Sequence, residues 1–412
     1  MKMGILGAPH GCTDAWPHVI LLDPYNAGLA LARRMTRLGA RVTVVESQPI
    51  VGRSRGVQGI VEPYKPSGER WLEVLGEIAR ESEQCVVLTG TDRASEWLVQ
   101  AAERLPANVH AFEHPDSAHL KLMSKERADA VAKSAGVRVP WTACVSTHEE
   151  FAAAAAEAPW PCVVKPVFSH QWRDRYGEKR AFFSEDSQAA QLVVGRPLQD
   201  GVPMLLSQYV PGDDGDVEEA IVVRLADGSY PVRFGCRKLR QYPAGFGETA
   251  VGESSALPET MALAQDVLDE AGFVGVAGVE TKRHAETGER WFLEVNVRLP
   301  GQWGLGDACG VQASPRLVAA LCGRPLGAQP QLRGGVRFVQ PDLDWHGMLP
   351  AVRAAPAGSR VGLTWRLMRP YFGARELGMF DPRDPGPLLA LFAQFAGRRI
   401  ARVRARLQRK SA

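Results

Sequence analysis

The feature that most constrains the fold is a pair of strand-like segments at positions 275–298, joined by the turn sequence AETGE. Residues of the second segment alternate between two faces, as in a β-strand. One face is wholly apolar and comprises Trp291, Leu293, Val295, Val297 and Leu299. The other carries Phe292, Glu294, Asn296 and Arg298. The two segments and their turn predict an antiparallel hairpin. Because asparagine is disfavoured in strands, its presence in this polar row favours a face that holds a charged ligand. A merely solvated face is the alternative.

The first strand of this hairpin carries a second acid, Glu280, in the segment GVAGVETK. Folding the turn back brings Glu280 opposite Glu294, and like charges opposite each other repel. A divalent cation removes that conflict, because Mg²⁺ prefers hard oxygen ligands and completes its octahedron with water and phosphates. Glu280, Glu294 and the Asn296 amide oxygen therefore form a candidate site for Mg²⁺, with Mn²⁺ as a substitute. A solvated hairpin with staggered acids is the alternative.

The bulk properties indicate a multidomain globular chain. Its 412 residues exceed one ordinary core and predict roughly two to four domains or subdomains. Hydrophobic residues make up 45% and charged residues 23%, which is typical of a soluble protein. No apolar run reaches the length of a membrane span, and the N-terminus lacks signal-peptide features. The seven cysteines are scattered without a CxxC pair, which favours a reducing, cytoplasmic location.

The formal net charge of +3 is unevenly distributed along the chain. The last fifteen residues hold seven basic side chains and no acid, which leaves the remainder mildly acidic. Ile400, Val403 and Leu407 recur at helical spacing, so the tail is expected to form a surface helix. Contact with nucleic acid, anionic lipid or an acidic carrier protein is the alternative.

Residues up to about position 115 alternate between strand and helix patterns, beginning with HVILLDPYNAGLALARRMTRLGARVTVVES. This alternation predicts an open, mostly parallel α/β domain. No GxGxxG follows its first strand, and no GxxxxGK[ST] occurs in the chain. The sequence therefore gives no support for a dinucleotide-dependent oxidoreductase or for P-loop chemistry.

Two lysines lie between this domain and the hairpin. Lys165 follows the apolar strand PCVVKP, from which its ammonium group can reach an anion or simply extend into solvent. Lys125 lies on the predicted helix LMSKERADAVAKSAG. Neither lysine is distinctive alone.

In their order along the chain, these segments resemble the ATP-grasp superfamily. Lys125 with the following AGVRVP is similar to the first lysine motif of that family, and Lys165 in VVKP to the second. LLSQYVPGDD resembles the hinge strand that reads adenine, and FLEVNVRLPGQ resembles the signature strand usually written EINPR. RKLRQYPAGFGETAVGES is similar to the carboxylate–amine ligase branch, which includes D-aspartate ligase-like enzymes. The resemblance covers roughly residues 20 to 330.

The resemblance implies an α/β fold of the α+β ATP-grasp type. An N-terminal Rossmann-like domain is expected over residues 1–118 and a small lid subdomain over 119–205. A large catalytic subdomain is expected over 206–330, followed by a C-terminal extension with the basic tail over 331–412.

The resemblance also implies how ATP is held. The α- and β-phosphates are neutralised by Lys125 and Lys165. The linker that pairs with adenine is formed by Gln208, Tyr209 and Val210. The ribose hydroxyls are bound by Asp214 or Asp216, between which the sequence does not choose.

Chemistry is expected at the hairpin and at one neighbouring strand. One or two Mg²⁺ ions between the β- and γ-phosphates are held by Glu280, Glu294 and Asn296. The transferring phosphoryl group is faced by Arg298 and Lys238, with Arg237 as the rival of Lys238. This arrangement suits phosphoryl transfer, where catalysis is mainly positioning and charge stabilisation.

The chain departs from the family pattern in two places. The loop after Lys165 is normally glycine-rich, but here it reads VFSHQWRDRYGEKR. Its closure over phosphates is expected to use the side chains of Ser169, His170 or Lys179, unless the loop serves the second substrate. A structural His170 is favoured over a catalytic one. The usual proline of the signature is replaced by Val297, which lies on the apolar face and should leave metal binding intact.

The implied activity is an ATP-dependent carboxylate–amine ligase that forms an amide through an acyl phosphate and releases ADP and phosphate. The alternatives are a carboxylase using carboxyphosphate, which RKLRQYP argues against, and a nucleotide-binding protein without turnover. The expected substrates are a small carboxylate and an amine, such as an amino acid or peptide, with a carrier-bound substrate as an alternative. A homodimer is the family-level expectation, and no nucleic-acid partner is expected.

Overall fold

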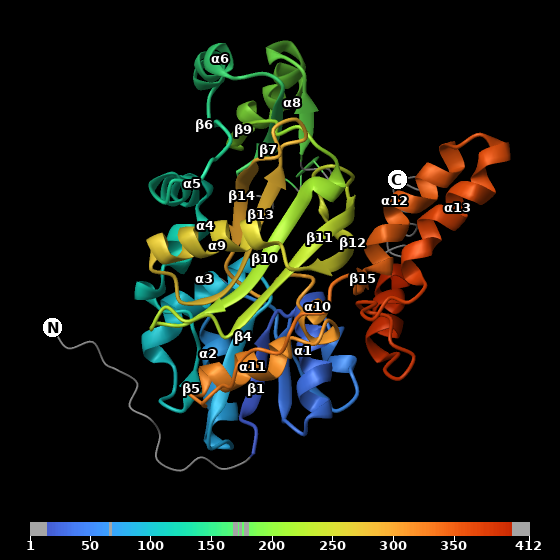
Figure 1. The fold of residues 1–412 in the computed structure, drawn as a ribbon. Coiled ribbons are helices and arrows are strands. Elements are labelled where there is room, and N and C mark those ends of the chain that lie inside the picture. Colours follow the sequence, from blue (N-terminus) through green and yellow to red (C-terminus); the bar gives the residue numbers. More distant parts are fainter. Residues whose placement is uncertain (1–14, 66–67, 168–171, 173–174, 177–180, 398–412) are drawn as a thin grey trace, which may run out of the picture.

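The computed structural model describes residues 15–65, 68–167, 172, 175–176 and 181–397. Its named strands form three sheets. In Figure 1 the N-terminal sheet lies at the bottom, the large antiparallel sheet crosses the middle and the smallest sheet lies at the top. Ser169, His170 and Lys179, predicted to help close the loop over phosphates, lie outside the described residues, as does the basic tail 398–412.

The N-terminal sheet is parallel and has the strand order β3-β2-β1-β4-β5, which confirms the predicted parallel α/β domain. Its strands are β1 (His18–Leu22), β2 (Val42–Glu46), β3 (Val57–Val61), β4 (Cys85–Thr89) and β5 (Val109–His110). The main helices of this part are α1 (Tyr25–Arg37), α2 (Glu69–Arg80) and α3 (Asp92–Ala101). Every residue of β1, β2 and β4 is buried, as expected for parallel strands covered on both faces.

The smallest sheet has the order β6-β9-β7-β8 and is antiparallel. Its elements are β6 (Thr142–Val145), α6 (His148–Glu157), β7 (Cys162–Pro166), β8 (Phe182–Ser184), α8 (Ser187–Gln199) and β9 (Met204–Gln208). Two helices, α4 (His119–Met123) and α5 (Lys125–Ser134), precede it. Val164 and Leu206 are buried in its core with residues of α6 and α8. Since side chains alternate along β7, Lys165 faces away from that core.

The large sheet has the order β14-β13-β10-β11-β12-β15, and its pairings are antiparallel. Its strands are β10 (Val217–Arg224), β11 (Val232–Tyr242), β12 (Glu248–Ser255), β13 (Gly275–Arg283), β14 (Arg290–Asn296) and β15 (Arg337–Val339). Helix α9 (Pro258–Ala271) packs against β10 and β14. The predicted hairpin is therefore confirmed as β13–β14, at one edge of this sheet.

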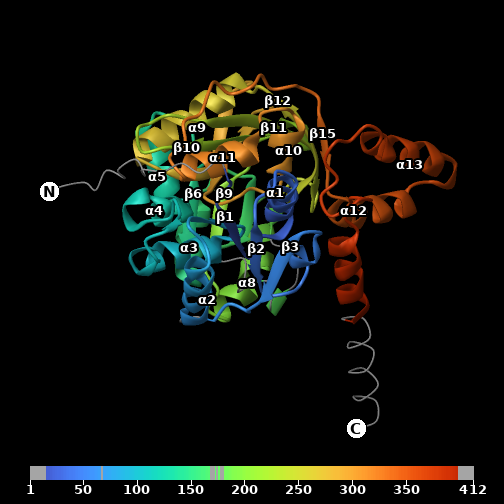
Figure 2. The same cartoon turned by 90° about the horizontal axis from the view of Figure 1, so that it is seen from below.

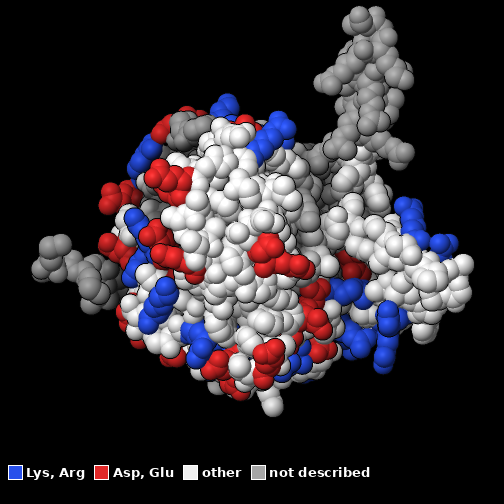
Figure 3. Space-filling view, turned by 90° about the horizontal axis from the view of Figure 1, so that it is seen from above, with Lys and Arg blue, Asp and Glu red and all other residues white. Residues whose placement is uncertain are grey.

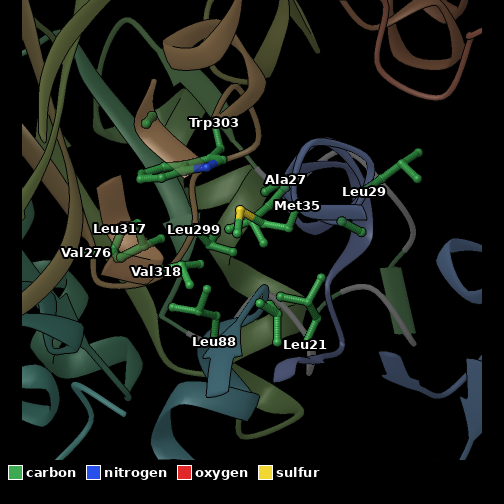
Figure 4. Packing of buried hydrophobic residues seen from close by; sticks show 14 of the residues in the cluster. Leu21, Ala27, Leu29, Met35, Leu88, Val276, Leu299, Trp303, Leu317 and Val318 are labelled. Carbon is green, nitrogen blue, oxygen red and sulfur yellow. The ribbon is translucent and has the colours of Figure 1, made fainter. Parts of the chain in front are cut away.

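One buried cluster joins the N-terminal sheet to the large sheet (Figure 4). Leu21 and Leu88 enter it from β1 and β4, while Leu299 and Trp303 enter it from the chain after β14. Helices α10 (Gly304–Ala308) and α11 (Ala313–Leu321) pack here against α1. The polar end of the signature segment is thereby fixed against the carboxyl ends of the parallel strands, where α/β sheets bind ligands.

The C-terminal extension leaves the body at β15. It forms α12 (Pro341–Ala354) and α13 (Arg360–Met368), which project from the rest of the molecule (Figures 1 and 2). A further helical stretch spans 386–397. The predicted division at residue 330 remains a prediction, although the large sheet continues beyond it to Val339. In the described part of the chain, no helix has both the length and the apolar character needed to cross a bilayer.

A buried acid, Glu113, lies where the N-terminal sheet meets the signature segment. Its Oε1 accepts hydrogen bonds from the hydroxyls of Thr89 (2.7 Å) and Ser95 (3.3 Å). Burial raises the pKa of Glu113 from 4.5 to about 7, against the opposing effect of these hydrogen bonds. Between these pH values the folded state keeps a proton that the unfolded state releases, so stability falls as the pH rises.

We expect Glu113→Gln to be more stable than the wild type at pH 8, by at most about 3 kcal/mol, and to lose this advantage by pH 5. The amide oxygen still accepts the Thr89 hydroxyl and carries no buried charge. Thermal unfolding at the two pH values measures the difference, with the exposed Glu96→Gln on α3 as the control. A stability difference that does not change with pH would contradict this prediction.

Candidate active site

Three glutamates form a row across neighbouring strands of the large sheet. Glu219 on β10 pairs with Glu280 on β13, and Glu280 pairs with Glu294 on β14. Residues directly opposite each other project from the same face, so the three carboxylates share one face of the sheet. The predicted juxtaposition of Glu280 and Glu294 is confirmed. Gly278 gives Glu219 its space, because a Cβ at that position would collide with the Glu219 carboxylate.

Glu219 was not anticipated from the sequence. Its side chain is buried, and its Oε2 atom has no hydrogen-bond partner among the described residues. Burial, followed by the negative charge of Glu280, raises the pKa of Glu219 to about 8. A local signal existed in the sequence VEEAIVV, where two adjacent acids interrupt an apolar strand.

Glu294 has a different electrostatic environment. Burial alone would raise the pKa of its carboxyl, but the positive charges of Lys165, Lys238, Lys125 and Arg298 together lower it below its usual value. Glu294 is therefore ionised at neutral pH and lies where cationic side chains of both antiparallel sheets converge.

Lys238 on β11 supplies the cation in the middle of the row. Its ammonium nitrogen lies 2.9 Å from each oxygen of Glu280, and its side chain is only 2% exposed. Burial alone would lower the pKa of Lys238. The negative charges of Glu280 and Glu219 more than offset this effect, so the net shift of the pKa is upward. Burial raises the pKa of the Glu280 carboxyl, and the positive charge of Lys238 opposes that shift.

The rival candidate, Arg237, is wrong for this role. Adjacent strand residues point to opposite faces, and Arg237 lies on the far face, 4.0 Å from Glu218 and 3.9 Å from Glu253. Its guanidinium is therefore separated from the carboxylate row by the sheet itself.

Asn296 and Arg298 follow Glu294 at the end of β14. The Arg298 guanidinium donates to Asn296 Oδ1 at 3.3 Å and to Asp92 Oδ1, at the start of α3, at 2.7 Å. Two contacts to the main chain fix the segment: the Leu299 amide donates to Thr89 O, and the Ser95 hydroxyl, 3.3 Å from both Val297 O and Glu113 Oε1, shares its one proton between these acceptors. Arg298 is thus shared between the signature segment and the N-terminal domain.

The predicted alternation along the signature strand is wrong at its start. The register shifts between Glu280 and Thr281, so that Thr281 pairs with Phe292 and Leu293 is an extra residue. Phe292 is therefore buried in the core with Val295 and Val297 rather than sharing the polar face. The predicted apolar position of Val297 is confirmed.

The bulge also positions Lys125. The carbonyl of Leu293 accepts a hydrogen bond from the Lys125 ammonium group at 2.5 Å, and Asp129 Oδ1 lies at the same distance. Burial, opposed by Asp129, lowers the pKa of Lys125, and Lys165 lowers it further. Lys125 and Lys165 thus approach the same region from α5 and β7, as the resemblance implies for the two phosphate-binding lysines.

The hinge segment is partly committed to protein contacts. The amides of Gln208 and Tyr209 donate to Trp141 O and Pro161 O, whereas the Val210 amide donates no hydrogen bond within the described residues. Asp214 accepts from the Gln241 amide at 2.8 Å and from the Gly245 amide at 2.9 Å. It therefore organises the turn after β11.

Asp216, the other ribose candidate, is paired with Arg283 at 2.5 Å. Both aspartates thus have protein partners, and the geometry does not choose between them for the ribose.

No set of three or more His, Cys, Asp or Glu side chains in the described residues is arranged to hold a metal ion by itself. The row nevertheless fits a divalent cation that shares its coordination with phosphate oxygens. The buried Glu219 Oε2 atom has no hydrogen-bond partner among the described residues. Asn296, two residues after Glu294 on β14, carries an amide oxygen that accepts from Arg298 at 3.3 Å.

Comparison with known proteins establishes the fold. No protein-family model and no curated protein sequence matches the chain. An ADP complex of purK, an N5-carboxyaminoimidazole ribonucleotide synthetase, superposes with a TM-score of 0.62 at 20% identity, covering 82% of this chain and 85% of that one. The corresponding Staphylococcus aureus synthetase with ADP gives 0.63 at 15% identity, covering 80% and 83%.

Biotin carboxylase from Campylobacter jejuni gives a TM-score of 0.57 at 15% identity, covering 77% of this chain and 74% of that one. The chain therefore has the ATP-grasp fold, with a parallel sheet preceding two antiparallel ones. Neither of these enzyme types is a D-aspartate ligase, and that finer resemblance remains a prediction.

Proposed function

We propose that the protein is an ATP-dependent ligase that joins a carboxylate to an amine. The observation that carries the proposal is the row Glu219, Glu280 and Glu294, faced by Lys125 and Lys165 from the other antiparallel sheet and its preceding helix. A buried carboxylate row is unfavourable alone, so it is best explained by a cationic or cation-bearing ligand. Lysines beside it suit the phosphates of that ligand.

Within this proposal, Glu280, Glu294 and Asn296 would hold Mg²⁺ with the help of Glu219, and the ion would offset negative charge on the β- and γ-phosphates. Lys125 and Lys165 bind the α- and β-phosphates. Gln208, Tyr209 and Val210 border the adenine. The Val210 amide, which donates no hydrogen bond within the part of the chain that the structure describes, is the main-chain donor that supports base recognition. Asp214 or Asp216 binds the ribose.

The chemistry proceeds in two steps, formation of an acyl phosphate and its conversion to an amide. A carboxylate oxygen of the substrate attacks the γ-phosphorus of ATP. The bond between the γ-phosphorus and the β-γ bridging oxygen breaks, and ADP leaves. The amine nitrogen then attacks the acyl carbon, phosphate leaves with the bonding pair, and the nitrogen loses a proton. Arg298 would stabilise the oxygens that gain charge in both steps, while Lys238 orients the Glu280 carboxylate through contacts to both of its oxygens.

An ATP-dependent carboxylase is the second candidate, in which bicarbonate takes the place of the organic carboxylate. It is supported by the fold neighbours, because biotin carboxylase is among them and another neighbour was solved with MgADP and bicarbonate. Arg298 would bind either carboxylate. The two functions are therefore separated by substrate dependence rather than by the residues of the site.

The decisive measurement is ADP release with candidate substrates offered singly and in pairs. The ligase requires an organic carboxylate and an amine together and proceeds in bicarbonate-free buffer. The carboxylase requires bicarbonate. A protein that binds ATP but releases no ADP under any of these pairings would contradict both proposals.

We expect Lys165→Ala to weaken ATP binding by about 10- to 100-fold, which corresponds to the loss of one charge-assisted contact. Calorimetric titration with a nonhydrolysable ATP analogue measures the change. Lys133→Ala, at the end of α5, is the matched control, because it removes the same charge without touching the site. Unchanged affinity in Lys165→Ala would exclude this lysine from phosphate binding.

A further inference from the structure

Helix α12 after its first turn and helix α13 form a projecting hairpin that we define as residues 345–375; the two acids of the first turn of α12, Asp342 and Asp344, lie at its root. Its root is fixed to the large sheet: Arg240 on β11 pairs with Asp344 at 2.7 Å and donates to Leu367 O at 2.9 Å. The Tyr371 hydroxyl also donates to Asp344, at 2.8 Å. The hairpin is thus held in a defined orientation, while the rest of it extends away from the body (Figures 1 and 2).

This hairpin exposes an unusual amount of apolar side chain. Helix α13 has no buried residue, and the only buried residue of α12 is Asp344. Val361 is 81% exposed, Trp365 66% and Phe372 58%. Together with the half-buried Met368 they recur at helical spacing and lie along one side of α13 and its continuation. A nine-residue helix is marginal by itself, so this face needs a covering surface.

The same hairpin is strongly basic. Residues 345–375 contain five arginines and no acid: Arg353, Arg360, Arg366, Arg369 and Arg375. Across the described part of the chain, none of these guanidinium groups lies within ion-pair distance of a carboxylate. Figure 3 shows the outer part of this projection as basic and uncharged atoms, unlike the mixed charge of the body.

We propose that this hairpin docks the protein onto an anionic phospholipid surface. The headgroups pair with the five arginines, and the stripe of Val361, Trp365 and Phe372 enters the boundary between headgroups and acyl chains. Tryptophan and arginine are the residues that this boundary accommodates best. The hairpin lies at the membrane surface and does not cross the bilayer.

The observations favour lipid over two other occupants. A second copy using the same face would bring like charges together, because the hairpin has no acid to pair with the arginines of its partner. An acidic protein would satisfy the charges. The apolar residues, however, follow one side of a helix as a continuous stripe, which a flat, fluid surface covers without a matching shape.

The test uses the full-length protein and vesicles of either phosphatidylglycerol or phosphatidylcholine in a co-sedimentation assay. We expect binding to phosphatidylglycerol vesicles only, weakening as salt is raised. The double variant Val361→Ser/Trp365→Ser should bind at least about tenfold more weakly, since two interfacial anchors are lost. Leu192→Ser is the matched control, because Leu192 is 89% exposed on the distant helix α8 and should not affect binding.

Three results would overturn the proposal. The first is equal or absent binding to the two kinds of vesicle. The second is full binding by the double variant, with binding lost instead on removal of the basic residues 398–412. The third is a concentration-dependent dimer in analytical ultracentrifugation that the double variant abolishes, without vesicle binding by the wild type, which would assign the face to a second copy.

Discussion

Glu294→Gln is expected to abolish ADP formation, lowering kcat by about a thousandfold or more, without disturbing the fold. Four cationic groups, Lys165, Lys238, Lys125 and Arg298, hold the Glu294 carboxyl ionised despite its burial. The amide keeps the shape of the side chain but removes the negative charge that these groups and the proposed cation share. A coupled assay for ADP, with circular dichroism as the check on folding, measures the effect.

The matched control is Glu253→Gln. Glu253 belongs to β12 of the same sheet, but it lies beside Arg237 on the face opposite the carboxylate row. The same chemical change there should leave turnover within about twofold of the wild type, as for a surface position away from the chemistry. Wild-type turnover in Glu294→Gln would remove the metal-binding role and, with it, the main support for a ligase.

The hairpin could be predicted because its determinants are local. The AETGE turn predicts the β13–β14 hairpin, but the regular pairing that begins with Arg283 and Arg290 would place Glu280 opposite Leu293. The extra residue at the bulge is what brings Glu280 opposite Glu294. The bulge at Leu293 has no comparable local signature. It reverses the face of Phe292 relative to Glu294, and its reason becomes visible only when Lys125 from α5 is seen to use the Leu293 carbonyl.

Glu219 could not be assigned from the sequence because its role depends on the order of strands in the sheet. β10 lies beside β13 although several elements separate them in the chain, and only this adjacency adds Glu219 to the row. Its neighbour Glu218 points to the other face, where it accepts hydrogen bonds from Thr260 and Arg290. The sequence alone does not distinguish the role of Glu218 from that of Glu219.

The choice between Lys238 and Arg237 required the same kind of information. Because adjacent strand residues point to opposite faces, only one of these two residues can face the site. The register of β11 against β10 determines which of the two it is. Cys236 pairs with Glu219, and Lys238, two residues further along, therefore shares the face of the carboxylates. The extension after residue 330 was equally unassignable, because its helices have few buried positions to create a periodic pattern.

Lys238→Met is expected to lower the free energy of unfolding by about 3–5 kcal/mol, the usual cost of removing one member of a buried ion pair. The Lys238 ammonium nitrogen lies 2.9 Å from both Glu280 oxygens, and burial deprives Glu280 of compensation by solvent. Methionine preserves most of the apolar stem. Chemical denaturation compares the variant with the wild type, and the ADP assay should show no turnover.

The double variant Lys238→Met/Glu280→Gln separates charge from packing. Replacing the stranded carboxylate with an amide should recover most of the lost stability but none of the activity, because Glu280 is a proposed cation ligand. Lys282→Met on β13 is the control: Lys282 is also buried, but its ammonium group lies 4.7 Å from the ring centre of Tyr209 rather than on a carboxylate. Its loss should cost only about 1 kcal/mol, the scale of a cation–π contact. Equal instability of the single and double variants would mean that the stranded Glu280 carboxylate is not the cause of the loss, and would assign it to the other contacts of the Lys238 ammonium group, Gln241 Oε1 and Gly247 O.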